Sequence, residues 1–547
     1  MSHTRLPFTM TPRAILVSSA AALLVLTALW IVCGNTFLPM NDAPSHIANG
    51  VIAHQTLARD AFFAGHYQFD LVLVPYWATA LLLVLGLPVL SPLLAWKLII
   101  ALYVVLLPLG CLVLARSVQQ GAPKDRVDPP LLPLVVLAVF HWGYWMGESN
   151  YLLGQPVALF ALCLLIRSER FLSLSFVGFL ILAALSYICH IYALTMLLIG
   201  ATAWALVAGL AHRVPALSPH KLRPFHAVGL GWVYLLFGIA AYFVLFQHGS
   251  DANRGSLGFD LSLRRLAHML IDPFDSPVPP PRFTLGLLYV GVLATLGWAH
   301  RDRLRTIGQR VFGQRQGALL PQLVELVHPA LFVPGITLLA AAYLGPVSIL
   351  AADGTQKEGE IAIRFVLGGF LLLVLSLRLP KLDSLRGPRG VLLAVMMLFA
   401  IVQLHSAHRL HRAIDARLVQ IDTTLLAKIP PHSRVLPLLD ISHGEWRDFL
   451  VHRIGNYVVL RDSYSPHVFA VRGQHPLRHH PWGDQREVTN LQVTQKEWSF
   501  YDYVLLQTDK PQLAQTLTPH LELIAAQDVF QLFRVVKPTP EAGTLSP

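Results

Sequence analysis

The sequence predicts an α-helical polytopic membrane protein with about eleven transmembrane helices and a small C-terminal α/β domain. Three observations carry this prediction. The chain of 547 residues is 54% hydrophobic and only 13% charged, whereas a typical soluble domain carries about 25% charged residues. Apolar runs of roughly 20 residues, the length that crosses a bilayer, recur up to position 408. After that position, histidines and short β-type runs replace them.

The charge distribution gives an expected orientation and argues against nucleic acid as a partner. The net charge is +11 and the mean hydropathy is +0.54. Much of the basic charge lies in short loops between apolar runs, where it favours a cytoplasmic location of those loops. The cysteines lie in or beside apolar runs and form no pattern typical of a disulfide framework or zinc site. They are Cys33, Cys111, Cys163 and Cys189.

Eleven apolar runs are the expected membrane spans. They cover about 14–33, 93–115, 131–147, 152–166, 171–189, 191–211, 226–246, 283–300, 329–351, 361–378 and 391–408. The first run has no good small-residue cleavage site before Asp42, so we expect a retained anchor rather than a signal peptide. With the N-terminus in the cytoplasm, these crossings place the basic clusters inside and the acidic or mixed loops outside.

One further apolar stretch, residues 71–90, is ambiguous. If it crossed the membrane, every later basic cluster would move to the outer side, against the positive-inside rule. Pro75, Gly86 and Pro88 suit a broken helix. We therefore expect this stretch to lie along, or dip into, the outer surface. The alternative, in which 71–90 and 93–115 both span, stays open.

The tail, residues 409–547, differs in composition from the rest. It contains four β-type runs, at 434–439, 457–460, 503–506 and 529–536, and helical stretches at 410–428 and 510–520. This pattern predicts a small α/β domain, which the crossing count places outside the cytoplasm. We expect a transmembrane domain over 1–408, with the first outer loop at 34–92, followed by this domain. The tail histidines match no closed zinc pattern.

Asp42 is the strongest candidate for chemistry. It follows the first apolar run, and on a helix it shares one face with His46. A carboxylate can hold a divalent cation or accept a proton from an attacking hydroxyl, and a nearby imidazole can orient it. The structural alternative is a helix cap, because Asn41 or Asp42 precedes a helix that begins near Pro44.

A second candidate segment is the expected outer turn at 141–156. Glu148 and Asn150 form an acid-x-amide pair that could direct two oxygens at one metal ion or sugar. Trp142 and Tyr144 could stack on a sugar ring or on an isoprenoid. An interfacial aromatic belt around a tight turn is the equally weighted alternative.

Arg364 and His190 are the remaining candidates. Arg364 enters an otherwise uncharged apolar run at its expected outer end, where a guanidinium can bind a lipid phosphate through two hydrogen bonds. The alternative is an arginine that snorkels to the interface. His190 interrupts the apolar region 171–211. It either marks the turn between two spans or faces the site.

With these residues in place, the layout resembles the GT-C superfamily of polyprenyl-phosphate-dependent glycosyltransferases, among uncharacterised bacterial members. The element Asp42-x-x-x-His46 is similar to the first-loop motif of oligosaccharyltransferase catalytic subunits, and Glu148-x-Asn150 lies where those enzymes carry a second acidic motif. The resemblance implies a GT-C-like fold and a divalent metal, Mg²⁺ or Mn²⁺, bound by Asp42 and Glu148. It also implies that Arg364 binds the lipid phosphate.

The resemblance further implies an inverting transfer of a sugar from a polyprenyl-phosphate donor to an extracytoplasmic acceptor, either a glycolipid, a polysaccharide or a protein. Asp42 and His46 would be the catalytic residues. Glu148, Asn150, His190, Arg364, Tyr144 and Trp142 would bind substrate. The expected location is a bacterial inner (plasma) membrane. Two alternatives stay open, namely a transporter or flippase of a lipid-linked saccharide and a non-enzymatic factor for assembly of cell-surface polysaccharide.

Overall fold

The computed structural model describes fourteen segments of the chain, and all structural statements below concern these residues. They are 12–69, 75–118, 132–213, 222–246, 256–271, 327–350, 356–358, 361–377, 388–440, 450–451, 453–469, 477–479, 500–510 and 521–537. The contacts divide the chain into two compact units, each of which is described by itself. Unit 1 comprises 1–34, 100–144 and 150–409, and unit 2 comprises 35–99, 145–149 and 410–547. The loop after the first apolar helix is therefore grouped with the C-terminal residues.

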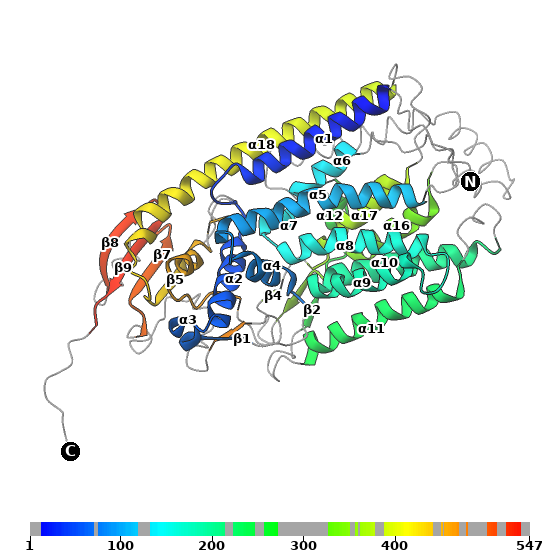
Figure 1. The fold of residues 1–547 in the computed structure, drawn as a ribbon. Helices are drawn as coiled ribbons and strands as arrows, with labels where there is room; N and C mark the ends of the chain where they lie inside the picture. The colour runs from blue at the N-terminus through cyan, green and yellow to red at the C-terminus, as the bar shows by residue number, and fades with distance from the viewer. Residues whose placement is uncertain are drawn as a thin grey trace, which may run out of the picture. The chain divides into compact units, whose positions relative to one another are not determined.

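Unit 1 is built from apolar helices that run nearly parallel to one another (Figure 1). They are α1 (Pro12–Cys33), α5 (Pro92–Val118), α6 (Leu132–Leu137), α7 (Trp142–Met146), α8 (Ser149–Arg167), α9 (Leu174–Cys189), α10 (Ile191–Leu210), α11 (Pro224–Phe246), α16 (Pro329–Leu344), α17 (Ile363–Ser376) and α18 (Pro388–Thr424). Residues 92–99 of α5, 145–146 of α7, 149 of α8 and 410–424 of α18 belong to unit 2. The short helix α12 (Leu263–Ile271) also lies in unit 1 but carries Arg264, Arg265 and His268. A short sheet of β2 (Ser256–Gly258), β3 (Ser348–Leu350) and β4 (Gln356–Glu358) accompanies them.

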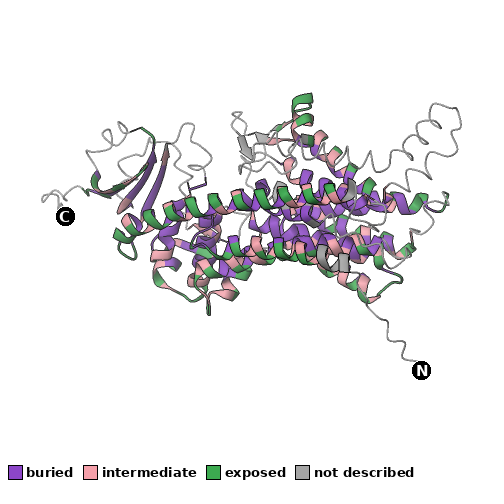
Figure 2. Cartoon of the chain, turned by 90° about the horizontal axis from the view of Figure 1, so that it is seen from above, coloured by how far each residue is buried: buried purple, intermediate pink, exposed green. Residues whose placement is uncertain are grey.

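The helices have the composition of membrane helices. Among the described residues, α5, α8, α10, α11 and α18 are long and apolar enough to span a bilayer, and α1, α9, α16 and α17 are apolar with shorter described stretches. Large apolar side chains lie on their outer faces, as the exposed fractions of Leu23 (64%), Ile181 (56%) and Leu235 (55%) show. Figure 2 shows the buried faces between the helices and the exposed faces outward. Such outward apolar surfaces are typical of lipid contact, so the chain is a helical membrane protein.

The described residues do not show the eleven expected spans. The segment expected as one span over 131–147 is broken into α6, a 3₁₀ turn (Ala138–Phe140) and α7, so that expectation is wrong. The break follows from His141, whose Nδ1 accepts the backbone N–H of Gly143 at 3.0 Å and so competes with a continuous helix. The expected span at 283–300 lies outside the described residues. In the ambiguous stretch 71–90, α4 (Ala78–Gly86) has nine residues and is too short to cross.

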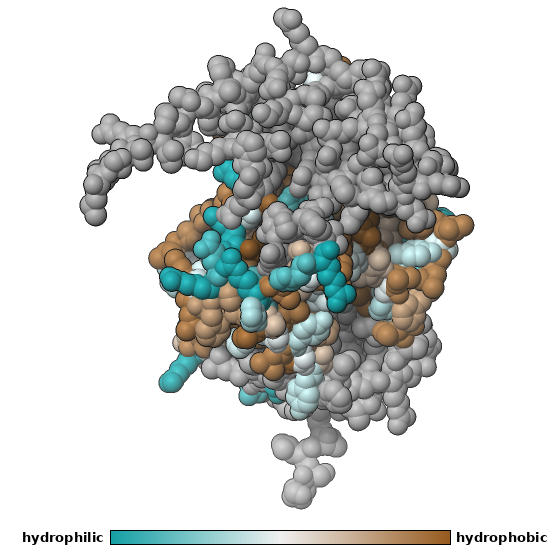
Figure 3. Space-filling view, turned by 90° about the vertical axis from the view of Figure 1, so that its right-hand side faces the viewer, coloured by the Kyte–Doolittle hydropathy of each residue, from teal (hydrophilic) through white to brown (hydrophobic). Residues whose placement is uncertain are grey.

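One end of unit 1 gathers exposed basic residues. The ends of α8 and α11 meet there, since Arg223 donates to the carbonyl of Glu169 and the His226 ring bonds the carbonyl of Ser168. The end of α5 joins them through Ser117 and Cys163. The exposed basic residues at these helix ends are Arg116, Arg167, Arg170, Arg213 and Arg223. Figure 3, which looks onto this end, shows hydrophilic side chains flanked by hydrophobic ones.

Unit 2 combines short helices with two sheets. The helices are α2 (Ala43–Leu57), α3 (Ala61–His66), α4, and the 3₁₀ helices η6 (Leu426–Lys428) and η7 (Ile454–Arg461). One sheet has the order β5-β7-β9-β8, in which β5 (Val435–Asp440) is parallel to β7 (Tyr503–Thr508), and β9 (Phe530–Val535) is antiparallel to both β7 and β8 (Leu521–Gln527). In the other, β1 (Tyr67–Phe69) pairs antiparallel with β6 (Leu477–His479).

The tail contains the strands that the sequence predicts at 434–439, 503–506 and 529–536. The prediction of a strand at 457–460 is wrong, because these residues belong to η7. The strand β8 was not predicted. The stretch 510–520, expected as helical, lies outside the described residues except for its first residue.

Candidate functional site

Asp42 is held at the start of α2 by its backbone. The N–H groups of Asn41 and Asp42 donate to the carbonyls of Trp145 and Met146, both at 2.9 Å. The next residue, Gly147, has φ of +81°, and a Cβ built there would lie 2.9 Å from the Asp42 nitrogen. The turn after α7 therefore fixes the position of Asp42 in unit 2.

The Asp42 side chain does not cap α2. Asp42 has helical φ and ψ of −91° and −3°, and its carboxylate makes no capping hydrogen bond to the helix. Pro44 in the first turn already removes one of the N–H groups that a cap would satisfy. The carboxylate instead forms an ion pair with Arg453, in which Nε lies 3.0 Å from Oδ1. The exposed fractions of the two side chains, 23% for Arg453 and 17% for Asp42, make the pair partly buried.

Phe469 connects this ion pair to His46. The guanidinium of Arg453 lies over the Phe469 ring, with 5.1 Å between its central carbon and the ring centroid. The His46 ring contacts the same ring at 5.0 Å and stacks on Trp96 at 5.8 Å with an interplanar angle of 18°. Asn49, one turn further along α2, donates from Nδ2 to the Phe469 carbonyl at 2.6 Å. Asp42 and His46 thus belong to one cluster of charged and aromatic groups.

Glu148 belongs to the same unit as Asp42 and directly follows Gly147, which packs on the Asp42 backbone. The donor set still fits a tightly held divalent cation poorly. Asp42 is already paired with Arg453, and no group of three or more His, Cys, Asp or Glu side chains converges within the described segments. Sites for Mg²⁺ or Mn²⁺ usually offer several oxygen ligands. We therefore derive no chemical step through a metal.

Arg364 lies in unit 1, at the start of α17, and is half-buried. Its guanidinium lies 4.5 Å from the Tyr192 ring centroid and 5.8 Å from that of Trp142. The backbone carbonyl of Arg364 accepts a hydrogen bond from the Tyr151 hydroxyl. The start of α17 has neither an acidic residue in its first turn nor a side-chain cap, so the helix dipole and the guanidinium together favour an anion there.

His190 serves as a helix cap between α9 and α10. Its Nδ1 accepts the backbone N–H of Tyr192 at 3.1 Å, and its ring stacks on Tyr192 at 5.0 Å and meets Tyr151 edge-on at 5.6 Å. Its turn-marking role is therefore present, and its ring also lies in the aromatic group around Arg364. Of the other candidates in unit 1, Tyr144 is fully buried against Phe140, with 4.8 Å between the ring centroids.

The structure therefore distributes the predicted site residues over two groups. Asp42, His46 and Glu148 lie in unit 2, whereas Trp142, Tyr144, Asn150, His190 and Arg364 lie in unit 1. Asn150 is buried and belongs to a different unit from Glu148, its proposed partner in the acid-x-amide pair. The sequence gives no sign of Arg453, Phe469 and Trp96, because no local pattern marks a residue that acts through a contact distant in sequence.

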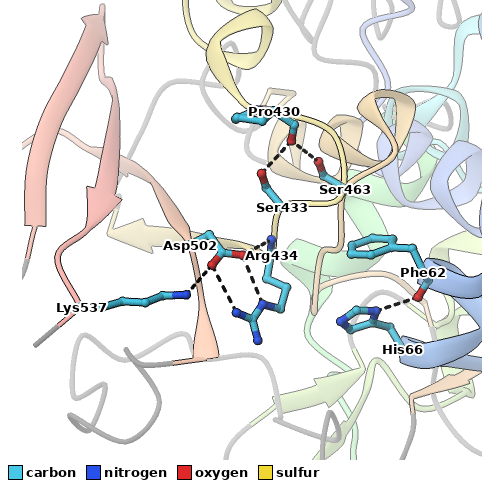
Figure 4. Close-up of polar contacts among 8 residues, drawn as sticks. All are labelled: Phe62, His66, Pro430, Ser433, Arg434, Ser463, Asp502 and Lys537. Atoms are coloured by element: carbon cyan, nitrogen blue, oxygen red, sulfur yellow. Dashed lines mark hydrogen bonds and ion pairs between the residues drawn. The ribbon is translucent and has the colours of Figure 1, made fainter. Parts of the chain in front are cut away.

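A second polar centre of unit 2 surrounds Asp502 (Figure 4). Arg434 donates to it from its backbone N–H at 2.9 Å and from its guanidinium to both carboxylate oxygens at 3.2 Å, and Lys537 donates at 2.7 Å. Burial alone would raise the pKa of Asp502, but these hydrogen bonds outweigh it and lower the pKa to about 2. This centre ties β5 and β7 to the residues after β9.

Comparison of the chain with protein-family models, with curated proteins and with solved structures found no match.

Proposed function

We propose that this protein is a membrane glycosyltransferase that moves a sugar from a polyprenyl-phosphate donor to an extracytoplasmic acceptor. The observation that supports it is the Asp42–Arg453 ion pair. It brings a proton acceptor and an anion-binding group together beside aromatic rings, within a chain of apolar helices. An acid–guanidinium pair of this kind suits a reaction in which a hydroxyl loses a proton while a phosphate leaves.

The acceptor hydroxyl attacks the anomeric carbon of the donor sugar from the face opposite the phosphate, which inverts that centre. The bond between this carbon and the phosphate oxygen breaks, and its electron pair leaves with the polyprenyl phosphate. The hydroxyl proton passes to the Asp42 carboxylate. Because protonation neutralises Asp42, it frees Arg453 to stabilise the negative charge that develops on the leaving phosphate.

Arg364 is a second candidate for phosphate binding. Its position at an uncapped helix start, between the rings of Tyr192 and Trp142, suits an anionic head group. If Arg364 only packed on the aromatic rings, its replacement would disturb that packing but would leave the affinity for the donor unchanged. The donor affinity of Arg364→Gln therefore separates the two roles.

The topology belongs to the same proposal. The exposed basic residues at one end of unit 1 favour a cytoplasmic location of that end, in a bacterial inner membrane with the N-terminus inside. An odd number of crossings would then place residues 409–547 outside the cytoplasm, where nucleotide sugars are absent and a lipid-linked donor is required. Cysteine accessibility from either side of sealed vesicles tests this orientation.

The direct test is Asp42→Asn in purified protein supplied with polyprenyl-phosphate sugars. We expect transfer to fall by at least about 100-fold, because the amide cannot accept the proton. The matched control is Asp422→Asn, since Asp422 also pairs with an arginine of unit 2, Arg461, at 3.0 Å. Full activity of Asp42→Asn would refute the proposal. If the parent protein moves the lipid-linked sugar across vesicle membranes but does not transfer it, the transporter alternative is favoured. If the parent protein shows neither activity, the assembly-factor alternative is favoured.

A further inference from the structure

Three buried polar atoms around the Asp42–Arg453 ion pair make no hydrogen bond in the structure. They are Oδ1 of Asn41, Oδ1 of Asn49 and Nε1 of Trp96. The exposed fractions of these residues are 3%, 4% and 1%. Buried polar groups are nearly always paired in folded proteins, and an unpaired one often marks a place that a ligand or a bound water completes.

These atoms belong to one connected cluster. Asn41 donates from Nδ2 to the Asp42 carboxylate at 3.4 Å. Asn49 is tied to the carbonyl of Phe469. Trp96 stacks on His46, which also contacts Phe469. The three unpaired atoms therefore lie on residues that contact Asp42, Phe469 or His46. We call these residues the Asn–Trp cluster.

The chemistry of the unpaired atoms defines the ligand. The two amide oxygens require donors, and the indole N–H requires an acceptor. A sugar hydroxyl both donates and accepts, so sugar hydroxyls can pair with both kinds of atom. A phosphate only accepts when ionised and leaves the amide oxygens unpaired, and a prenyl chain pairs with none of them. Aromatic rings next to such groups suit the apolar face of a sugar ring.

We propose that the Asn–Trp cluster is the subsite that binds the sugar of the lipid-linked donor. This assignment rests on the proposed glycosyl transfer. The adjacent guanidinium of Arg453 favours a sugar that carries a phosphate over a neutral acceptor glycan. Asn41, Asn49 and Trp96 would hold the sugar ring beside the Asp42–Arg453 ion pair, with Arg453 at its phosphate.

The test is Trp96→Phe, which removes the indole N–H and keeps an aromatic ring. The probes are short-chain prenyl-phosphate glucose, mannose and arabinose, bare prenyl phosphate, and the free sugars as acceptor-like ligands. Affinity is measured with full-length protein in detergent. We expect at least one glycosylated probe to bind more tightly than bare prenyl phosphate. Trp96→Phe should weaken that probe about 5- to 10-fold, as expected for one hydrogen bond, and leave bare prenyl phosphate unchanged.

The matched control is Trp204→Phe. Trp204 lies in α10, is 2% exposed and also has a buried, unpaired Nε1. If removal of an unpaired N–H acts only through protein stability, both variants change the melting temperature and neither changes the affinity. We expect only Trp96→Phe to weaken the glycosylated probe. Asn49→Ala gives a second, independent loss of affinity, and its melting temperature reports on folding.

The outcomes separate this inference from the proposed function. If Trp96→Phe binds every probe as the parent protein does, or if no glycosylated probe binds better than bare prenyl phosphate, the subsite is refuted even where transfer persists. If free sugars alone depend on Trp96, the cluster binds acceptor and the donor assignment is wrong. Conversely, Trp96-dependent binding without any transfer upholds the subsite and refutes the glycosyltransferase.

Discussion

Gly147 lies against the backbone of Asp42 so closely that no side chain fits between them. A Cβ at Gly147 would lie 2.9 Å from the Asp42 nitrogen, and its φ of +81° belongs to a region that L residues rarely adopt. The contact holds the candidate base in place through main-chain atoms alone. The position of the carboxylate therefore depends on a residue that has no chemistry of its own.

Gly147→Ala is expected to destabilise the protein by about 1–3 kcal/mol, because it adds backbone strain and a steric clash. It should also reduce glycosyl transfer, since Asp42 must shift. Thermal unfolding and initial transfer rates measure both effects. Gly65→Ala is the control, because a Cβ there meets nothing within 4 Å. If the two substitutions behave alike, the Gly147 contact does not position Asp42.

Removing one member of the Asp42–Arg453 ion pair should cost more stability than removing both. A partly buried charge that loses its partner is poorly solvated, at a cost of roughly 1–3 kcal/mol, whereas the double neutral variant removes both charges. We expect Asp42→Asn combined with Arg453→Gln to be more stable than the sum of the single variants predicts. Denaturant unfolding of the four proteins gives the coupling energy. A coupling near zero would show that the pair contributes no net stability.

The Asp502 centre should make stability depend on pH in a defined window. The folded-state pKa of about 2 lies below the usual value of 3.8, so the stabilisation is complete above pH 3.8 and is lost as the pH falls towards 2. Because Asp502 is partly exposed, we expect a contribution of about 1–2 kcal/mol. Unfolding measured between pH 2 and 6 should show this slope in the parent protein. Asp502→Asn should flatten it, and an unchanged slope would contradict the assignment.

Asn456 should be essential to the packing of α2 on η7. It is 1% exposed, donates to the Ser45 hydroxyl at 2.7 Å and accepts from the Ser465 hydroxyl at 2.7 Å. Asn456→Ala leaves both hydroxyls buried without this partner, at an expected cost of about 2–4 kcal/mol. Thermal unfolding measures it against Thr423→Ala, which removes only exposed hydrogen bonds to α18 carbonyls. A loss no larger than in the control would contradict the role of Asn456.

The sequence predicts the elements of this protein better than the contacts between them. Apolar run length is a local property, so the helices that contain 93–115 and 191–210 could be predicted directly. The break at His141 depends on a single side chain that competes with the helix backbone, which run length does not reveal.

The same limit applies to the candidate site. Asp42 and His46 could be identified, because an acid and an imidazole one helical turn apart after an apolar run form a local pattern. Their partners Arg453 and Phe469 could not, because they reach the site through tertiary packing of η7 and its neighbours. As the phosphate-binding cation the sequence indicated Arg364, which lies in unit 1, and it gave no indication of Arg453.

Residues 67–69 depend on partners that are synthesised much later. The strand β1 pairs with β6, and the Tyr67 hydroxyl donates a hydrogen bond to the Ser465 carbonyl at 2.6 Å. When the first helix has entered the membrane and residues 35–69 have been synthesised, their partners β6 and Ser465 have not yet been made. These residues must wait until nearly the whole message has been translated. A chain cut short before residue 465 would therefore enter the membrane without the partners that this segment packs against.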